Sequence, residues 1–412
     1  MSEKRVIVVG GGAAGLMAAG QAAENGAEVI LLEKMKRPGR KICISGKGRC
    51  NLTNSAGIPE FVEHFGKNGR FLRQAFSRFF APDLLMFFQE KGLAVSLERG
   101  GRYFPTSGKA SDILNVLQAW LDKLGVSLRT SSPVDRIVFN DDKIEGVKIG
   151  KKTIPADAVI IATGGKSYPS TGSTGDGYAL AAAAGHTIVP VRPALVPLQI
   201  RGGIEPSLVG LEMRNCEIRL LINGKQKRKL FGELHFLKTA IGGPVVLTVS
   251  RQAVDALEEG KKVEILLDLK PALDIQKLDK RLIRDFETRH REVLSEVLRG
   301  LLPAGLIPLC LQQTAIPAEC LAGQIIKKER KKLLHWFKEQ RMEVTGHRPF
   351  TEAIVTAGGV TLSEVNPQTM ESKCVAGLYI TGELLDLDGT TGGYNLQAAF
   401  STGWLAGRAA AS

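Results

Sequence analysis

Residues 5–33 read RVIVVGGGAAGLMAAGQAAENGAEVILLE, and this stretch decides the fold class. The run Arg5–Val9 is apolar and β-branched, which predicts a buried strand. The run Ala13–Asn25 is rich in good helix formers, and Gly26 stands where a helix would end. A second apolar run, Glu28–Leu32, predicts another strand. Together these elements form one βαβ unit of a parallel sheet, so the sequence predicts an α/β protein.

The turn between the first strand and the helix has the pattern G-x-G-x-x-G, formed by Gly10, Gly12 and Gly15. In dinucleotide-binding folds the first glycine makes the tight turn, the second lets a pyrophosphate approach the backbone, and the third lets helix and strand pack closely. The helix N-terminus, at Ala13, would then face the phosphates with its free N–H groups. Glu33 ends the second strand, where a carboxylate can bind ribose hydroxyls and disfavours a 2′-phosphate. The alternative is a glycine-rich turn without a ligand.

A second glycine-rich stretch, residues 39–54, reads GRKICISGKGRCNLTN. It is rich in polar and basic residues and poor in core-forming ones, so we expect a loop that wraps a phosphate or a flavin edge with backbone donors. Lys47 and Arg49 would bind phosphate or stabilise negative charge at flavin N1 and O2. The P-loop pattern cannot be laid on this stretch. A mobile surface loop is the alternative.

A third stretch, residues 377–396, reads GLYITGELLDLDGTTGGYNL. It predicts a strand that ends in Gly382-Glu383, then a glycine-rich turn and a helix of small residues over roughly 396–408. In an FAD-binding fold the acid would take a ribityl hydroxyl, and the helix dipole would favour the anionic reduced flavin. An ordinary loop before a terminal helix is the alternative.

The middle of the chain interrupts this pattern. Short strands are predicted at Cys216–Ile222, Val245–Val249 and Val263–Leu267, and Asn223-Gly224 is a strong hairpin signal. Apolar residues then recur at helical spacing, namely Leu278, Leu282, Phe286, Val293 and Val297. We therefore expect a Rossmann-like FAD-binding domain in two pieces, residues 1–190 and 351–412. A β-rich, barrel-like insert would take residues 191–270 and about 341–350, and a helical insert would take residues 271–340.

The composition is that of a soluble globular protein, with 44 % hydrophobic and 24 % charged residues. No apolar run approaches the roughly 18 to 20 residues of a membrane helix, and the early first strand leaves no room for a signal peptide. We expect no membrane association and a cytoplasmic protein. The six cysteines form no C-x-x-C pair and no zinc-ligand spacing, so reduced thiols are expected.

The net charge is +13, and residues 191–350 carry 28 basic against 19 acidic residues. Two dense clusters stand out, Lys225 with Lys227–Lys229 and Lys327–Lys332. A basic surface favours an anionic partner such as nucleic acid, phosphate or lipid head groups. Solubility together with the cofactor's phosphates is the other explanation, and a charge run is more often a solvated face.

With the stretches GRYFP at 101–105, ATGG at 162–165, LVPL at 195–198, TAGGV at 356–360 and TMESK at 369–373, the three motifs make the chain resemble the YhiN/BaiN-like family of FAD-dependent oxidoreductases. The resemblance spans residues 6 to about 407, and S-G-x-G-R-C-N-x-T-N with G-G-Y-N is highly specific. It implies a three-part fold, FAD held by the first and last segments, and a cytoplasmic bacterial enzyme. Members reduce a steroid C=C bond in bile-acid metabolism, reduce a uracil in ribosomal RNA, or oxidise a small amino ketone. The resemblance therefore fixes the cofactor better than the substrate.

The motifs and the resemblance together assign a set of cofactor-binding residues: Gly10, Gly12, Ala13, Ala14, Gly15, Glu33, Lys34, Arg40, Lys41, Ser45, Gly46, Gly48, Arg49, Cys50, Asn51, Val134, Thr163, Gly164, Gly165, Gly382, Glu383, Asp386, Gly393, Asn395 and Leu396. Family members commonly read F-T-H-x-G-x-S-G-P in the β insert, whereas this chain reads FLKTAIGGP at 236–244. A substrate or NAD(P)H contact by those family residues would be altered here.

Five functions remain open from the sequence. A flavin reductase would pass hydride to an activated C=C bond of a small molecule such as an enone, with NADH or NADPH as reductant. The same chemistry on ribosomal RNA would use the basic inserts for docking, and an amine or amino-ketone oxidase would use oxygen. A non-catalytic flavin module, or a thiol–disulfide enzyme using Cys43 and Cys50, completes the set. Tyr394, Cys50 and Lys47 are the candidate catalytic groups, no metal site is expected, and the oligomeric state is left open.

Overall fold

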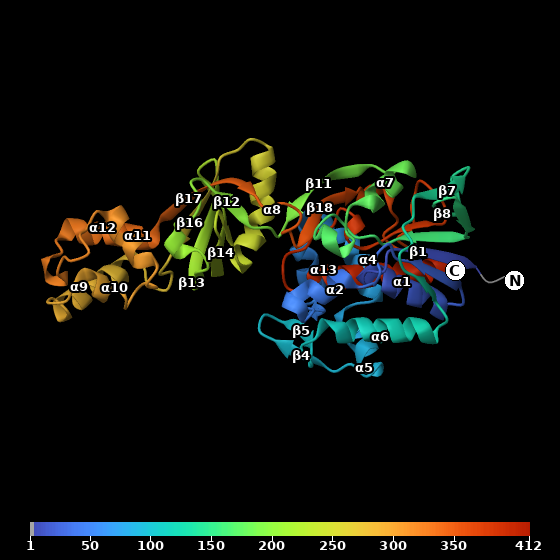
Figure 1. The fold of residues 1–412 in the computed structure, drawn as a ribbon, viewed down its shortest axis with the longest axis horizontal. Helices are drawn as coiled ribbons and strands as arrows, with labels where there is room; N and C mark the ends of the chain where they lie inside the picture. The colour runs from blue at the N-terminus through green and yellow to red at the C-terminus, as the bar shows by residue number, and fades with distance from the viewer. Residues whose placement is uncertain (1–3) are drawn as a thin grey trace. The chain divides into compact units, whose positions relative to one another are not determined.

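The computed structural model describes residues 4–412, which divide into two compact units. The first unit comprises the chain up to Ala194 together with Phe350–Ser412, and the second comprises Leu195–Pro349. Figure 1 shows the first unit as a layered α/β body and the second as a barrel followed by helices. The predicted fold class, a Rossmann-like domain interrupted by a barrel and a helical segment, is confirmed.

A five-stranded parallel sheet in the order β19-β10-β1-β2-β6 forms the centre of the first unit. Its strands are β1 (Arg5–Val9), β2 (Glu28–Leu32), β6 (Ser127–Arg129), β10 (Ala158–Ile161) and β19 (Leu378–Ile380). Val8 pairs with Leu31 on one side and Ile160 on the other, and all three are fully buried. Strands buried on both faces read as continuous apolar runs, which explains why the sequence located β1 and β2.

Two helices of small residues, α1 (Ala13–Glu24) and α13 (Tyr394–Ala411), lie side by side next to this sheet. A Cβ atom added at Gly403 would lie 2.3 Å from the Ala14 carbonyl oxygen, and one at Gly407 would lie 2.2 Å from that of Ala18. The two backbones therefore approach so closely that only glycine fits on α13. The first and last segments of the chain are fixed to each other in this way.

Smaller elements complete the first unit. The small sheets are β3-β5-β4 (Thr53–Asn54, Arg102–Pro105, Val95–Glu98), β7-β8-β9 (Arg136–Asn140, Lys143–Ile149, Lys152–Pro155) and β11-β18 (Ile188–Ala194, Val355–Val360). The remaining α-helices are α2 (Arg40–Ile44), α3 (Ile58–His64), α4 (Arg73–Arg78), α5 (Ala81–Glu90), α6 (Ala110–Lys123) and α7 (Asp176–Ala183). Helix α6 is amphipathic, and Ile113, Leu117 and Leu121 form its buried face.

The second unit contains a closed six-stranded barrel in the order β12-β15-β14-β13-β16-β17. Its strands are β12 (Leu198–Ile200), β13 (Glu212–Ile222), β14 (Lys225–Phe236), β15 (Ala240–Gly242), β16 (Val263–Asp268) and β17 (Gln340–His347). Asn223 and Gly224 both have positive φ, +49° and +73°, and connect β13 to β14. Positive φ at both central residues defines the type I′ hairpin turn, so the predicted hairpin is confirmed.

The predicted strand at Val245–Val249 is wrong, because these residues lie in helix α8 (Pro244–Glu258). Pro244 occupies the first turn of that helix, where its missing N–H costs nothing. Val245, Val249 and Ala253 are buried at helical spacing against the barrel. A short β-branched run does not by itself distinguish a strand from a buried helix, and here burial of one face over four turns outweighs the β-propensity of valine.

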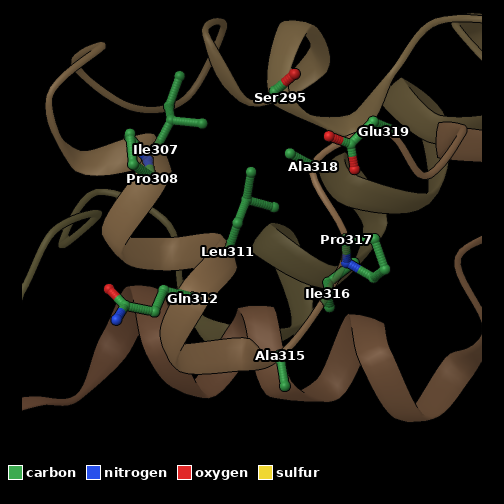
Figure 2. Close-up of a pocket in the computed structure, with 10 residues that line it drawn as sticks. All are labelled: Ser295, Ile307, Pro308, Leu311, Gln312, Ala315, Ile316, Pro317, Ala318 and Glu319. Carbon is green, nitrogen blue, oxygen red and sulfur yellow. The ribbon is translucent and has the colours of Figure 1, made fainter.

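The predicted helices after the barrel are α9 (Ile275–Thr288), α10 (Leu294–Leu298), α11 (Leu306–Thr314) and α12 (Lys327–Lys338). A hollow of about 660 Å³ lies beside α11. Figure 2 shows the residues that line it: Ser295, Ile307, Pro308, Leu311, Gln312, Ala315, Ile316, Pro317, Ala318 and Glu319. None of the residues assigned from the motifs lines this hollow. Among residues 4–412, no helix has both the length and the apolar character required to cross a membrane.

Candidate functional site

The motif residues gather at the carboxyl ends of four neighbouring parallel strands. Gly10 follows β1, Glu33 follows β2, Thr163 follows β10 and Gly382 follows β19. Ligands of open α/β sheets bind outside the carboxyl ends of the strands. Segments that are hundreds of residues apart in the sequence thus form one candidate site.

The three glycines of the first turn have three different surroundings. Gly10 has φ +106°, and a Cβ there would lie 2.6 Å from the Ala162 carbonyl oxygen. A Cβ at Gly15 would lie 1.8 Å from the Gly10 oxygen, whereas one at Gly12 would meet no atom within 4 Å. Chain packing therefore requires Gly10 and Gly15 but leaves space next to Gly12, as expected where a pyrophosphate approaches the backbone.

The N-terminus of α1 faces this space with unpaired donors. Leu16 N is the first amide to donate within the helix, to the Gly12 oxygen at 2.9 Å. The N–H groups of Ala13, Ala14 and Gly15 therefore precede the first helical hydrogen bond. Free N–H groups and the positive end of the helix dipole together favour an anion.

The Glu33 carboxylate is buried beside this turn. It accepts hydrogen bonds from Gly11 N at 2.8 Å and Met35 N at 2.7 Å. The ammonium group of the next residue, Lys34, forms an ion pair with Asp176 and a hydrogen bond to Thr174, so it is already paired within the protein. Val134 is half-buried, two residues after Ser132, whose N–H donates to the Glu33 carbonyl oxygen. Glu33 is thus fixed by backbone donors, and Val134 lies two residues beyond the Ser132 amide that contacts the Glu33 backbone.

The stretch at residues 39–54 is more ordered than the expected loop. It forms α2, a 3₁₀ turn at Ser45–Gly48 and the short strand β3, and Gly46 and Lys47 have positive φ within the turn. Ser45 Oγ donates to the Ile42 oxygen at 2.7 Å. Gly48, Lys47 and Arg40 are exposed. The Arg49 guanidinium pairs with Glu98 and lies 4.3 Å from the centroid of the Phe104 ring, so it anchors the turn to the β4–β5 hairpin.

Two residues assigned to the cofactor from the motifs are paired with each other. Lys41 Nζ lies 2.6 Å from Glu383 Oε2 and 2.5 Å from Ser167 Oγ. Glu383 Oε1 accepts from Ser167 Oγ and from Thr356 N, both at 2.8 Å. A Cβ at Gly165 would lie 2.4 Å from Thr356 Oγ1, so this network closes over the Thr163-Gly164-Gly165 turn. Sequence reasoning missed Ser167 and Thr356, although Thr356 lies in the quoted TAGGV stretch.

The start of α13 packs directly on the second stretch. A Cβ at Gly393 would lie 2.5 Å from the Thr53 carbonyl oxygen, and Asn54 Nδ2 donates to the Gly392 oxygen at 2.9 Å. The Asn395 side chain ties the turn to itself through Gly389 N and O. Helix α13 begins after Gly393, and its first hydrogen bond runs from Gln397 N to the Gly393 carbonyl oxygen. The N–H groups of Tyr394, Asn395 and Leu396 precede that bond. The positive end of a second helix therefore faces the same site.

Asp386 is held by Asn68, whose Nδ2 donates to the Asp386 carbonyl oxygen and to Oδ2 at 2.8 and 2.9 Å.

Tyr394 stacks on His64, with ring centroids 3.7 Å apart, and makes an edge contact with Phe61. Burial raises the pKa of the Tyr394 hydroxyl and lowers that of His64. His64 Nδ1 lies 2.6 Å from Thr390 Oγ1. Of the candidate catalytic groups, the Tyr394 ring is therefore packed against other aromatic rings, whereas the Lys47 side chain is exposed to solvent.

Cys50 is fully buried, and desolvation raises the pKa of its thiol to about 12. We expect the native protein to resist alkylation at Cys50 at pH 8, because the thiolate is the reactive form. A rise of the pKa from 9 to about 12 lowers the thiolate fraction about 1,000-fold at that pH. Peptide mass spectrometry after iodoacetamide treatment measures this, with the half-exposed Cys320 as internal control. Equal labelling of the two cysteines in folded protein would contradict the burial.

The site fits FAD by its own geometry. Besides the space at Gly12 and the two helix N-termini, three buried polar atoms in the motif segments have no hydrogen-bond partner among residues 4–412: Asn51 Oδ1, Thr53 Oγ1 and Thr163 Oγ1. Buried polar atoms without a partner are rare, and a bound ligand is one way to satisfy them. The residues present therefore match a ligand with a pyrophosphate and several polar edges.

Comparison with known proteins defines the class. A model of the HI0933-like protein Rossmann domain matches residues 4–409. The 3-dehydro-bile acid delta(4,6)-reductase of Clostridium scindens is 35 % identical over 409 residues, 99 % of each chain. The ribosomal RNA dihydrouridine synthase of Haemophilus influenzae is 30 % identical over 403 residues, 97 % of this chain and 96 % of the relative. Fold and relatives define an FAD-dependent oxidoreductase. The chain belongs to the HI0933-like family, the YhiN/BaiN-like flavoproteins of the sequence resemblance.

Solved structures show the same fold in more distant proteins. The 3-ketosteroid delta1-dehydrogenase from Sterolibacterium denitrificans in complex with 1,4-androstadiene-3,17-dione superposes with a TM-score of 0.51 at 12 % identity, covering 98 % of this chain and 99 % of the other. The Mycobacterium smegmatis Sdh1 complex gives 0.52 at 18 % identity, covering 99 % and 68 %. At such identities the likeness shows the fold alone.

Proposed function

We propose that the protein reduces an activated C=C bond in a small molecule of the steroid-enone type. The full-length similarity to the bile-acid reductase, 35 % identity with 99 % of both chains aligned, carries this proposal. Bound FAD would supply the hydride for the β carbon, and a proton would go to the α carbon. NADH or NADPH is the proposed reductant, and the cytoplasm is the proposed location.

The residues of this chain would hold the cofactor by their own chemistry. The N–H groups of Ala13, Ala14 and Gly15 would bind the pyrophosphate beside Gly12. Glu33, fixed by Gly11 N and Met35 N, would accept hydrogen bonds from ribose hydroxyls. The N-terminus of α13 would stabilise negative charge on the ring system.

The Lys41–Glu383 ion pair gives these two residues a shared role in the proposal. Three donors already occupy the Glu383 carboxylate: Lys41, Ser167 and Thr356. We propose that Glu383 positions the Lys41 ammonium at the cofactor's edge, where a positive charge stabilises a reduced, anionic ring. Half-burial of both side chains strengthens the interaction compared with an exposed pair.

Ribosomal RNA is the second candidate substrate, favoured by a basic strand in the barrel. Lys225, Lys227 and Arg228 are exposed on β14, and within residues 4–412 none of them forms an ion pair. Phe231, 63 % exposed, lies on the same strand and offers a face for base stacking. Two relatives at 30 % identity, from Haemophilus influenzae and Escherichia coli, are ribosomal RNA dihydrouridine synthases. Unpaired cations and an exposed ring on one strand are the kinds of group that contact RNA phosphates and bases.

One experiment separates the candidates. The flavin is reduced anaerobically, and its reoxidation is followed after addition of a dehydro-steroid enone, a uridine-containing ribosomal RNA fragment, or oxygen. We expect the enone to reoxidise the flavin fastest and to be recovered with two more hydrogen atoms. Fast reoxidation by RNA alone would overturn the small-molecule proposal, and fast reoxidation by oxygen alone would indicate an oxidase. If neither NADH nor NADPH reduces the bound flavin, the result would indicate a non-catalytic flavin-binding module.

For the RNA arm the matched variants are the double charge reversals Lys227→Glu with Arg228→Glu and, as control, Lys151→Glu with Lys152→Glu in the other unit, where both lysines are also exposed. An RNA substrate predicts weaker binding by about tenfold or more in the first pair and little change in the control at equal ionic strength. Equal RNA affinity of the two double variants would show that Lys227 and Arg228 on β14 do not bind RNA.

A further inference from the structure

Three side chains with metal-binding atoms meet away from the candidate flavin site. His186 follows α7, Glu364 ends a 3₁₀ turn, and Cys374 precedes β19. Their ligand atoms lie within 4.8 Å of one another. Cys374 is at the amino end of β19, whereas Gly382 follows its carboxyl end, so the cluster and the flavin motifs lie at opposite ends of this strand.

The spacing of these atoms suits one tetrahedral ion. His186 Nδ1 lies 3.2 Å from Glu364 Oε2, and Cys374 Sγ lies 3.9 Å from the same nitrogen. Around zinc, bonds of about 2.0 Å to nitrogen and oxygen and about 2.3 Å to sulfur place such ligand pairs roughly 3.3 and 3.6 Å apart. The two pairs that include His186 are therefore within a few tenths of an ångström of this spacing, and the Glu364 and Cys374 atoms lie within 4.8 Å of each other.

The surroundings hold the ligands in place. The imidazole of His186 is buried, and its other nitrogen, Nε2, lies 2.7 Å from Ser372 Oγ. The Glu364 carboxylate accepts from Thr187 N at 2.8 Å. A ligating histidine normally forms a hydrogen bond through its second nitrogen, and a ligating carboxylate is itself hydrogen-bonded. Thr187 N supplies the outer contact of the carboxylate, and Ser372 Oγ, which also accepts from Cys374 N and Val375 N at 3.0 Å, holds the imidazole through Nε2.

Burial and charge favour a divalent cation of borderline softness. A thiolate and a carboxylate together carry two negative charges, which a Zn²⁺ ion neutralises, and imidazole, thiolate and carboxylate are all zinc ligands. Cys374 and Glu364 are partly exposed, so an ion and a fourth ligand, water, can reach the cluster. Binding would release the thiol proton to solvent and move the imidazole proton to Nε2.

We propose that His186, Glu364 and Cys374 form a zinc site with three protein ligands and water as the fourth. The ion would join the end of α7 to the turn at residues 362–364 and the loop before β19, which lie about 180 residues further along the chain. Its role is to stabilise the first unit, because the flavin motifs follow β19 at its other end. This site is independent of the substrate proposed above.

The test uses the flavin-loaded protein after treatment with a chelator and dialysis. Zinc content by atomic emission is expected to reach about one ion per chain after addition of stoichiometric Zn²⁺, and the melting temperature is expected to rise. Co²⁺ in place of zinc is expected to give a thiolate-to-cobalt absorption band. Less than about one tenth of an ion per chain, or no cobalt–thiolate band, would overturn the site.

Two variants assign the ion to these residues. Cys374→Ser is expected to lower zinc affinity at least about 100-fold and abolish the cobalt–thiolate band, while flavin content stays unchanged. Ser372→Ala, which removes the outer contact of His186, is expected to cost about 10- to 100-fold. Cys320→Ser, a half-exposed cysteine of the second unit, is the control and should bind zinc like the parent protein. Unchanged zinc binding in Cys374→Ser would contradict the proposal.

Discussion

Replacing Gly12 by valine is expected to weaken FAD binding strongly while leaving the protein folded. A side chain at Gly12 meets no atom of the chain within 4 Å, and the backbone there is extended, with φ −84° and ψ −169°, which valine adopts without strain. The same side chain would occupy the space where the pyrophosphate approaches the α1 N–H groups. Each lost hydrogen bond to a charged group costs about 1.5–3 kcal/mol, so the affinity for FAD should fall about 100-fold or more.

The measurement is the flavin-to-protein absorbance ratio after purification, together with the thermal melt of the apoprotein. Gly57→Val is the matched control, because Gly57 also precedes a helix with extended backbone, φ −77° and ψ 166°, and a Cβ added there would lie 3.7 Å from its nearest neighbour, Pro59 Cδ. Full flavin content in Gly12→Val would show that the cofactor does not contact this turn. Loss of flavin together with a much lower melting temperature of the apoprotein would show that Gly12 is needed for folding.

Replacing Gly403 by alanine is expected to cause the largest loss of stability. The added methyl carbon would lie 2.3 Å from the Ala14 carbonyl oxygen, in contact with backbone that cannot rotate away. One helical turn further along, Gly407 holds α13 equally close to Ala18, so the helices cannot separate at one point without separating at the other. We expect a loss of about 3 kcal/mol in unfolding free energy, or roughly 6–12 °C in melting temperature, with reduced flavin content because the start of α13 shifts.

The control is Ala409→Ser, which adds one heavy atom at a half-buried position of the same helix. It should melt within about 2 °C of the parent protein. A Gly403→Ala protein with the parent's melting temperature would mean that α1 and α13 pack less closely than the structure shows.

Much of the first unit could be predicted from the sequence because its signals are local. The βαβ unit with its glycine-rich turn in the first unit, and likewise the Asn223-Gly224 turn in the second, each depend on residues within one short window, where periodicity and backbone conformation decide the structure. Val245–Val249 shows the limit, since a valine run satisfies a strand and a buried helix equally until its neighbours are known. The cofactor roles of the individual residues, and the boundaries of the three predicted domains, stay predictions.

The sequence by itself therefore determined the βαβ unit with its dinucleotide turn, the α/β class and the family. Tertiary structure decided which charged groups meet: Lys41 pairs with Glu383 across 342 positions of the chain, Arg49 pairs with Glu98, and His186 faces Glu364 and Cys374. The physical reason is the separation along the chain of the residues that interact. Backbone conformation and hydrophobic periodicity act over a few residues and leave a readable pattern, whereas an ion pair or a ligand cluster depends on where the packed sheet brings distant loops together, and no local pattern records that position.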